Sequence, residues 1–393
     1  MHILIISDAY PPMRTSCATQ IFDLAQAFIE QSHQVSIIIP AHSQKASVEI
    51  SNKDGPTIYS VRCFKTKDVG YVLRTLAEFI NPFVIGLHLK RNQCFLNQKI
   101  NGIAWYSPTI FWGPLVKELK TLFNCKAYLI LRDIFPDWAL DLGLLKKNLI
   151  YTFFKRVEWY QYGQADCIGV QSPNNLKYFQ KHNPSFGPKV EVLWNWGGQK
   201  DNKKCKIEIS KSVLEGKKIC VYAGNMGVAQ GIHYLFELVK FLKNNEGIGF
   251  VFVGRGSELA WLRAESALLG LKNIIFYDEI DSKEITGLYA QCHIGLLSLD
   301  FRHTTHNIPG KLIRYLESKL PIVGFVNKGN DLMKISHDNS MGLLLDNVSE
   351  EALGQAENFI NNLEFYEMKT EQIINLFDLK NKIKQIIYFL NQK

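Results

Sequence analysis

The chain has 393 residues, of which 47% are hydrophobic and 21% are charged. That length exceeds what one hydrophobic core usually supports, so two domains are expected, and the composition excludes a disordered or collagen-like chain. A net charge of +8 favours anionic partners, which include nucleic acid, a phosphate-bearing small molecule and an acidic membrane surface.

The eight cysteines are scattered and none forms a C-x-x-C pair, so they predict reduced thiols rather than a disulfide or zinc framework. The amino-terminal apolar run ends at Ser7-Asp8 and is too short for a signal peptide. No uninterrupted apolar segment reaches the roughly 18 residues that span a bilayer. We therefore expect a cytoplasmic protein.

Short apolar runs alternate with helical patterns along the whole chain, as in strands that are buried on both faces of a parallel sheet. They form two batches, which predict an α/β protein of two Rossmann-like, doubly wound domains facing across a cleft. The runs of the first batch are residues 2–6, 34–39, 57–61, 102–106, 126–131, 165–170 and 190–194. Those of the second batch are residues 218–224, 248–254, 273–278, 293–299, 321–326 and 342–346.

Between the batches lies a polar, lysine-rich segment with a Gly-Gly pair. We place the first domain at 1–196, a linker and domain entry at 197–217, and the second domain at 218–365. Residues 366–393 space their apolar side chains at three and four, which predicts a closing amphipathic helix.

Two loops of the first domain could carry chemistry. The loop after the first strand opens a helix near Ser16, where free N–H groups favour anions, although an ordinary strand-to-helix loop explains it equally well. After the strand at 126–131, Arg132 and Asp133 precede an aromatic loop with Trp138. These residues indicate acceptor binding or proton handling, and the alternative is a charged pair that caps the sheet edge.

Residues 146–162 mix basic and aromatic side chains on a helical pattern. Such a helix can lie in an anionic membrane interface. The alternative is a core helix whose basic groups extend along its apolar surface to reach water.

In the second domain, glycines follow two strands. Gly224 and Gly227 allow close approach of a ligand, and a helix begins just after Gln230. This pattern indicates phosphate or sugar binding, and the alternative is a glycine turn that serves packing alone. Arg255 stands between two glycines and offers a fork suited to diphosphate oxygens.

A further helix begins at Pro309, because proline suits the first turn. Its wheel predicts a buried face that contains Leu312, Ile313, Leu316 and Leu320. The opposite face is expected to carry Lys311, Arg314, Tyr315 and Ser318. Two cations near its start indicate an anion site, and the alternative is a solvated polar face.

Several common motifs are missing from the sequence, among them H-E-x-x-H, G-x-S-x-G, the Walker lysine motif and a D-x-D pair. We therefore expect neither a metal site nor a dedicated serine nucleophile. The basic residues are dispersed and match no nucleic-acid motif, so nucleic acid is not an expected partner.

The ensemble resembles the family 4 glycosyltransferases, which are retaining enzymes with the two-domain GT-B fold. The resemblance rests on "SDAYPP", "RDIFPDWALDLG", "LWNWGG", "YAGNMGVAQG", "VGRG", "IPGKLIRYLESKLPIV" and "MGLLLDN", and it runs nearly the full length. More narrowly, the chain looks like the branch from bacterial surface-polysaccharide loci that is often labelled L-fucosamine transferase.

The resemblance implies a hexosyl- or N-acetylhexosaminyl-type transferase that acts without a metal or cofactor. A UDP-linked sugar would serve as donor and a saccharide on a polyprenyl diphosphate as acceptor, in O-antigen, lipopolysaccharide, capsule or exopolysaccharide synthesis. The donor would contact Gly224, Asn225, Gly227, Gln230, Arg255, Pro309, Lys311 and Arg314. The acceptor side would include Ser16, Arg132 and Trp138, with Asp133 as the candidate catalytic residue, and the protein would sit peripherally on the inner face of the plasma membrane.

The sequence departs from the family pattern at three places. Asn225 and Gln230 stand where many members have arginine and lysine, so Lys311 is the expected replacement. Thr15-Ser16 replaces a usual glycine pair. Arg314 occupies the position of a glutamate that commonly holds the donor ribose, and Glu317 is an imperfect substitute. Two alternatives remain, namely a GT-B sugar-nucleotide epimerase and a non-catalytic nucleotide-sugar-binding partner of a polysaccharide-synthesis complex.

Overall fold

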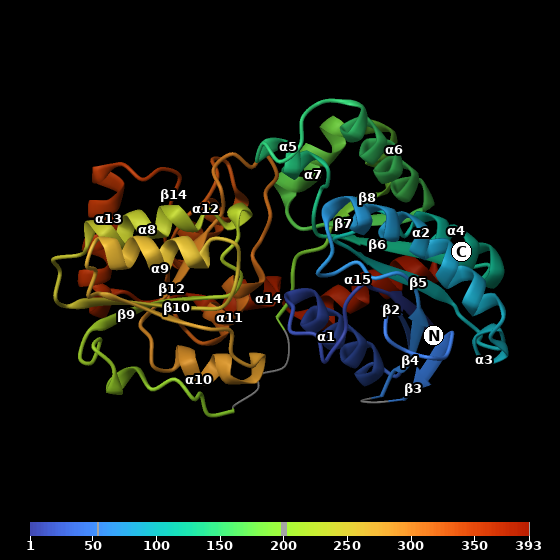
Figure 1. Ribbon diagram of the computed structural model, residues 1–393, viewed down its shortest axis with the longest axis horizontal. Coiled ribbons are helices and arrows are strands. Elements are labelled where there is room, and N and C mark those ends of the chain that lie inside the picture. The colour runs from blue at the N-terminus through green and yellow to red at the C-terminus, as the bar shows by residue number, and fades with distance from the viewer. Residues whose placement is uncertain (53–54, 198–202, 393) are drawn as a thin grey trace. The chain divides into compact units, whose positions relative to one another are not determined.

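The chain forms two α/β units in the computed structural model, which describes residues 1–52, 55–197 and 203–392 (Figure 1). The first unit combines Met1–Gly198 with Leu379–Lys393, and the second comprises Gln199–Asp378. Residues 198–202 of the predicted linker lie outside the described residues.

An eight-stranded sheet forms the first unit, in the order β3-β4-β2-β1-β5-β6-β7-β8. All neighbouring strands are parallel except β3, which pairs antiparallel with β4 at the edge. The strands are β1 (His2–Ile6), β2 (Gln34–Ala41), β3 (Val48–Ser51), β4 (Thr57–Arg62), β5 (Gly102–Ser107), β6 (Lys126–Leu131), β7 (Cys167–Val170) and β8 (Val190–Val192).

Helices cover both faces of this sheet. Alternate residues of a strand point to opposite faces, so a strand that is apolar throughout needs a core on each side. Leu4 and Ile6 join a core with α2, α4, α6 and α7, whereas Ile3 and Ile5 join a core with α1 and α15. The helices are α1 (Ser16–Glu30), α2 (Tyr71–Lys90), α3 (Gln93–Leu96), α4 (Gly113–Phe123), α5 (Asp137–Asp141), α6 (Leu149–Gln164), α7 (Pro173–His182) and α15 (Leu379–Asn391), with a 3-10 turn, η1 (Pro184–Lys189), before β8.

A six-stranded, fully parallel sheet forms the second unit, in the order β11-β10-β9-β12-β13-β14. Its strands are β9 (Lys218–Ala223), β10 (Ile248–Val253), β11 (Ile274–Tyr277), β12 (Ile294–Ser298), β13 (Ile322–Phe325) and β14 (Gly342–Leu345). The helices are α8 (Ile232–Phe241), α9 (Leu259–Leu268), α10 (Ile285–Tyr289), α11 (Gly310–Glu317), α12 (Asp331–Asp338), α13 (Glu350–Asn361) and α14 (Thr370–Leu376). Short 3-10 turns are η2 (Ile209–Lys211), η3 (Val228–Gln230), η4 (Ser282–Glu284) and η5 (Leu363–Phe365).

Each apolar run of the sequence forms a strand, which confirms the doubly wound class. β3 was not predicted from the sequence, since Val48–Ser51 is a half-exposed edge strand that lacks a continuous apolar run.

The chain from 366 to 393 was expected to be one helix, and the structure differs. It breaks into α14 and α15, and the second helix packs in the first unit, where Ile383, Ile386 and Leu390 join the α1 side of the core. Gln385 Nε2 also donates to the Val192 carbonyl at 2.9 Å. Apolar spacing alone does not reveal which core a helix enters.

Candidate functional site

The order of strands in the second unit reverses between β9 and β12. The chain winds from β9 outward to β10 and β11, and then returns to β12, β13 and β14 on the other side. In open α/β sheets a ligand binds outside the carboxyl ends of the strands at such a switch point. The loops after β9 and β12 are therefore the candidate site.

The loop after β9 is joined to the loop after β10 by backbone hydrogen bonds. Met226 N donates to the Arg255 carbonyl at 2.8 Å, and Glu258 N donates to the Met226 carbonyl at 3.0 Å. Gly254 and Gly256 have φ of 144° and 154°, and a Cβ on either would lie within 2.3 Å of the β9 loop backbone. Only glycine permits this close approach, so the glycine pair around Arg255 shapes the β9 loop.

Arg255 itself extends to the surface, and its side chain is 64% exposed. Its Nε lies 3.5 Å from a carboxylate oxygen of Glu279. The Arg255 guanidinium, which was predicted to bind diphosphate, thus lies at the carboxyl edge of the sheet. Its contact with the acidic neighbour is long, so it is only loosely held.

The loop after β12 closes on the same glycine loop. Ser298 Oγ donates to the Gln230 carbonyl at 2.6 Å, and Gly231 (φ 54°) lies directly against the backbone of Asp300. Burial would raise the pKa of the Asp300 carboxyl, but hydrogen bonds from the Arg302 side chain and backbone hold that pKa below its usual value. Asp300 is therefore a charged anchor of the loop, which sequence analysis did not select.

α11 begins at Gly310 and buries Leu312, Ile313 and Leu316, as the helical wheel predicted. Tyr315, which the wheel assigned to the polar face, is wholly buried, so that assignment was wrong. Its hydroxyl donates to the carbonyls of Val221 and Leu296, which belong to the two strands at the switch point. Gly295 leaves the space that the tyrosine ring fills.

Lys311 lies at the carboxyl edge of β9. Its Nζ stands 3.4 Å from the centroid of the Tyr222 ring and within about 4 Å of the position that a Cβ on Gly224 would take. This Nζ is buried and has no hydrogen-bond partner among the described residues. Burial holds the pKa of Lys311 well below its usual value. A buried amine of this kind is stabilised in its charged form by a nearby anion.

Arg314 is not an unpaired cation beside Lys311, because its guanidinium lies 3.5 Å from a carboxylate oxygen of Glu317. Both side chains are about three-quarters or more buried. Pro309 caps the helix with an extended backbone and no side-chain bond, and its carbonyl accepts a hydrogen bond from Leu312 N at 3.1 Å. Asn225 is exposed in the glycine loop, where its carbonyl accepts from Tyr222 Oη at 2.6 Å.

In the first unit the predicted residues also lie at the carboxyl ends of strands. Ser16 is exposed at the first turn of α1, with Thr15 as its cap. Arg132 is only 5% exposed, and its guanidinium stacks 4.4 Å from the Trp196 ring and donates to the Leu193 carbonyl. Burial lowers the pKa of this guanidinium. Arg132 therefore acts first as a packed element of the unit.

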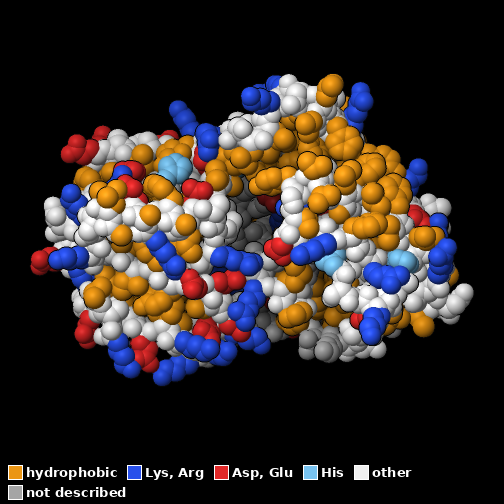
Figure 2. All heavy atoms as spheres, viewed as in Figure 1, with side chains coloured by type: hydrophobic (Ala, Val, Ile, Leu, Met, Phe, Trp, Pro, Cys, Tyr) orange, Lys and Arg blue, Asp and Glu red, His pale blue; other side chains and the backbone are white. Residues whose placement is uncertain are grey.

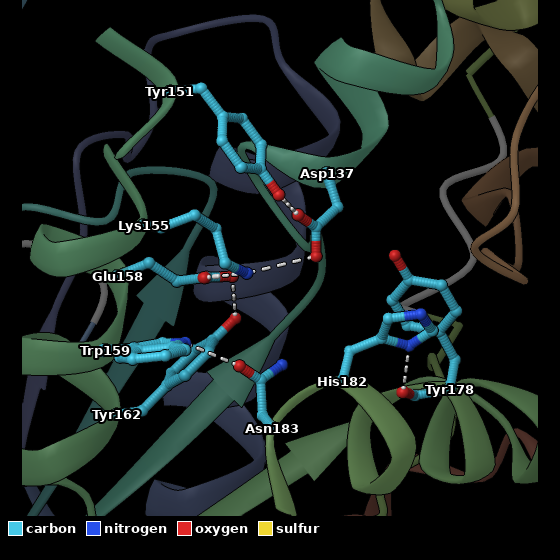
Figure 3. Close-up of polar contacts among 9 residues, drawn as sticks. All are labelled: Asp137, Tyr151, Lys155, Glu158, Trp159, Tyr162, Tyr178, His182 and Asn183. Atoms are coloured by element: carbon cyan, nitrogen blue, oxygen red, sulfur yellow. Dashed lines mark hydrogen bonds and ion pairs between the residues drawn. The ribbon is translucent and has the colours of Figure 1, made fainter. Parts of the chain in front are cut away.

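Asp133 and Trp138 are half-buried in the loop that follows β6. The Trp138 ring packs against Phe135 with centroids 6.0 Å apart. Between them in sequence, Asp137 is buried and accepts hydrogen bonds from Tyr151 Oη at 2.8 Å and Lys155 Nζ at 3.2 Å (Figure 3). The aromatic loop is thus fastened to α6 through an ionic network.

Glu158 lies at the centre of that network and is wholly buried. It pairs with Lys155 and accepts a hydrogen bond from Tyr162 Oη at 2.7 Å (Figure 3). Burial raises the pKa of this carboxyl to about 7, above the 4.5 of an unperturbed glutamate. The protonated Glu158 carboxyl therefore stabilises the folded chain. This contribution is complete below the pKa that Glu158 has in the unfolded chain, and it is lost as the pH rises through about 7.

We expect Glu158→Gln to flatten the pH dependence of unfolding. The free energy of unfolding of the unmodified chain should fall between pH 5 and pH 8, and that of the variant should fall less, as measured by chemical denaturation. Exposed Glu49→Gln serves as the control and should retain the original slope. Identical slopes in Glu158→Gln and the unmodified chain would contradict a raised pKa at Glu158.

The described residues contain no group of three or more His, Cys, Asp or Glu side chains that could hold a metal ion. Tyr222 and Trp196 were not predicted as site residues, and Tyr315 was predicted only as part of the polar face of α11. Their signal was weak, because a buried aromatic residue in an apolar run resembles any core residue.

Residues 205–375 match the family model "Glycosyl transferases group 1". WbjE of Pseudomonas aeruginosa, named as a glycosyltransferase, is 22% identical over 57% of this chain and 57% of its own length. WcaI of Escherichia coli K12, named as a colanic acid biosynthesis glycosyl transferase, is 23% identical over 70% of this chain and 71% of its own. Both names are provisional, and the match to WbjE spans less than two thirds of that protein.

Among solved structures, an E. coli structure described as trehalose-6-phosphate bound with UDP-2-fluoro glucose superposes with a TM-score of 0.72. The match covers 100% of this chain and 99% of that one at 11% identity. The likeness confirms the GT-B fold that the sequence predicted.

Proposed function

We propose that the chain is a retaining glycosyltransferase of bacterial polysaccharide synthesis, because residues 205–375 match the family model of the group 1 glycosyl transferases. Its donor is a UDP-linked sugar, and its acceptor is a saccharide on a polyprenyl diphosphate. The names of WbjE and WcaI support the reaction class, and the nucleotide sugar in the E. coli structure supports the carrier.

One observation carries the proposal, namely the buried Lys311 amine beside the glycine loop at the switch point. A diphosphate placed there gives this Nζ the anionic partner that it lacks among the described residues. Backbone N–H groups at the start of α11 would add hydrogen-bond donors. Positive charge at this place stabilises the diphosphate as it departs, which lowers the barrier to transfer.

In this proposal Lys311 and Arg255 neutralise the leaving diphosphate, so the reaction needs no metal ion. The ribose is held by Glu317, with Arg314 orienting its carboxylate through their 3.5 Å ion pair. Asp133 of the first unit positions the acceptor hydroxyl, and Ser16 and Trp138 contact the acceptor sugar. The transferred sugar is a hexosyl or N-acetylhexosaminyl group, with an L-fucosamine as one candidate.

The test is a panel of nucleotide sugars, each offered with and without polyprenyl-diphosphate-linked saccharides and read by mass spectrometry. We expect a mass gain of one sugar on an acceptor and release of the nucleotide diphosphate. An isomerised nucleotide sugar without acceptor would instead identify an epimerase. Nucleotide binding without turnover in any combination would identify a non-catalytic partner. The presence of Arg314 where family members commonly have a glutamate would explain that result.

A further inference from the structure

α2 is apolar on two sides. Its inner side belongs to the core of the first unit, where Ile85 and Leu89 are at most 1% exposed. A helix that is apolar all round is normally buried all round. The outer side nevertheless presents seven large apolar residues that are 41% to 74% exposed, namely Val72, Leu73, Leu76, Phe79, Ile80, Phe83 and Leu87.

α6 extends this exposed side. Phe153 is 40% exposed, and its ring lies 5.9 Å from that of Phe79. At the start of α6, Leu149 and Ile150 are 88% and 56% exposed. We call these three residues and the seven of α2 the α2–α6 surface. Figure 2 shows hydrophobic side chains gathered on the part of the first unit that carries these helices.

The charges around the α2–α6 surface are predominantly positive. Lys146, Lys147 and Arg156 are exposed and form no ion pair within the described part of the chain. The carboxylates of α2 and α6 are Glu78 and Glu158, and each is paired with a cation of its own helix. An anionic partner would therefore meet unpaired cations and no unpaired carboxylate from either helix.

α2 also has the length and composition of a membrane-crossing helix, with a mean hydropathy of 1.3. It is nonetheless tied to its unit, because Asn81 is buried and bonds both the N–H and the carbonyl of Phe64 at 2.9 Å. Insertion across a bilayer would break these bonds and expose the core around Ile85. The helix can lie on a membrane more readily than across it.

We propose that the α2–α6 surface docks the protein on an anionic lipid bilayer, the inner leaflet of the plasma membrane. The exposed stripe runs along a helix about 30 Å long, and lysines flank it. Lysine is depleted in protein interfaces, whereas apolar side chains flanked by basic ones are typical of helices that bind lipid surfaces. The proposal stands apart from the transfer reaction, since it would hold for any activity of the second unit.

The test is co-sedimentation of the full chain with vesicles of phosphatidylcholine alone or mixed with phosphatidylglycerol. We expect binding to the mixed vesicles that weakens as salt is added. Phe83→Glu and Leu149→Glu should each lower the partition coefficient about tenfold, because each removes an apolar side chain that would be buried in the bilayer. Removing the charges of Lys146 and Lys147 together should lower the partition coefficient about 30-fold.

Leu268→Glu is the matched control, because Leu268 is 80% exposed on α9 of the second unit, and it should bind as the unmodified chain does. Binding that is absent, or that Phe83→Glu and Leu149→Glu leave unchanged, would overturn the proposal. So would a dimer in light scattering that Phe83→Glu dissociates, because the surface would then join two copies. Sugar transfer to a water-soluble acceptor should be equal in Phe83→Glu and the unmodified chain, so vesicle binding and the transfer reaction are tested separately.

Discussion

Replacing Lys311 with methionine is expected to weaken binding of UDP by about 1.5 to 3 kcal/mol and, in the same protein, to stabilise the ligand-free chain. The loss of affinity follows because a charge-assisted contact to the diphosphate disappears. The gain in stability follows because the Lys311 amine is buried over the Tyr222 ring without a hydrogen-bond partner in the described residues. Methionine fills a similar volume and has no charge to bury.

Calorimetric titration with UDP and thermal unfolding without ligand measure the two effects. Because the pKa of Lys311 is lowered by burial, the folded chain releases this proton before the unfolded chain does. Stability of the unmodified chain therefore recovers as the pH rises towards 10.5, and the advantage of the variant should shrink over the same range.

Lys334→Met is the matched control, since Lys334 is exposed on α12 of the same unit, and neither quantity should change there. Unchanged UDP affinity in Lys311→Met would remove Lys311 from the donor site. Lower stability of the ligand-free variant would show that the ammonium is not a cost to the fold.

Gly254→Ala is expected to destabilise the second unit by about 3 kcal/mol or more and to abolish UDP binding. Its φ of 144° lies in a region that L residues rarely adopt, and the new Cβ would lie 2.0 Å from the Gly224 carbonyl oxygen. Relief of that contact must separate the β9 and β10 loops, which shape the space beside Lys311. Thermal unfolding should show a fall of about 6 to 12 °C.

Gly270→Ala separates backbone strain from collision. Gly270 also has a positive φ, 61°, but a Cβ there meets nothing within 4 Å. We expect a cost of about 1 kcal/mol and normal UDP binding. Equal effects of the two substitutions would show that close approach of the two loops is not what makes Gly254 necessary.

The sequence by itself determined the fold class, the number of domains and the sheet edges at which site residues are expected. Strands buried on both faces of a parallel sheet must be apolar throughout, so runs such as 218–224 and 248–254 are legible without a structure. Glycines and cations that follow such runs lie at the carboxyl ends of the strands, which places Gly224 and Arg255 at one edge. β3 escaped notice because an exposed edge strand is under no such constraint.

Tertiary structure alone decided the roles of single side chains. A helical wheel assigns Tyr315 to the polar face, yet its ring fills the space that Gly295 leaves and its hydroxyl bonds to β9 and β12. The wheel contains no information about that space. Likewise, burial beside Tyr222 leaves Lys311 without a hydrogen-bond partner among the described residues, and Glu317 pairs with Arg314.

The α2–α6 surface likewise exists only after folding, which brings Phe79 and Phe153 together from distant segments. Local pattern reports which residues prefer to leave water. The packing of distant segments decides which of them succeed, and therefore which charges and apolar side chains remain for a ligand or a membrane.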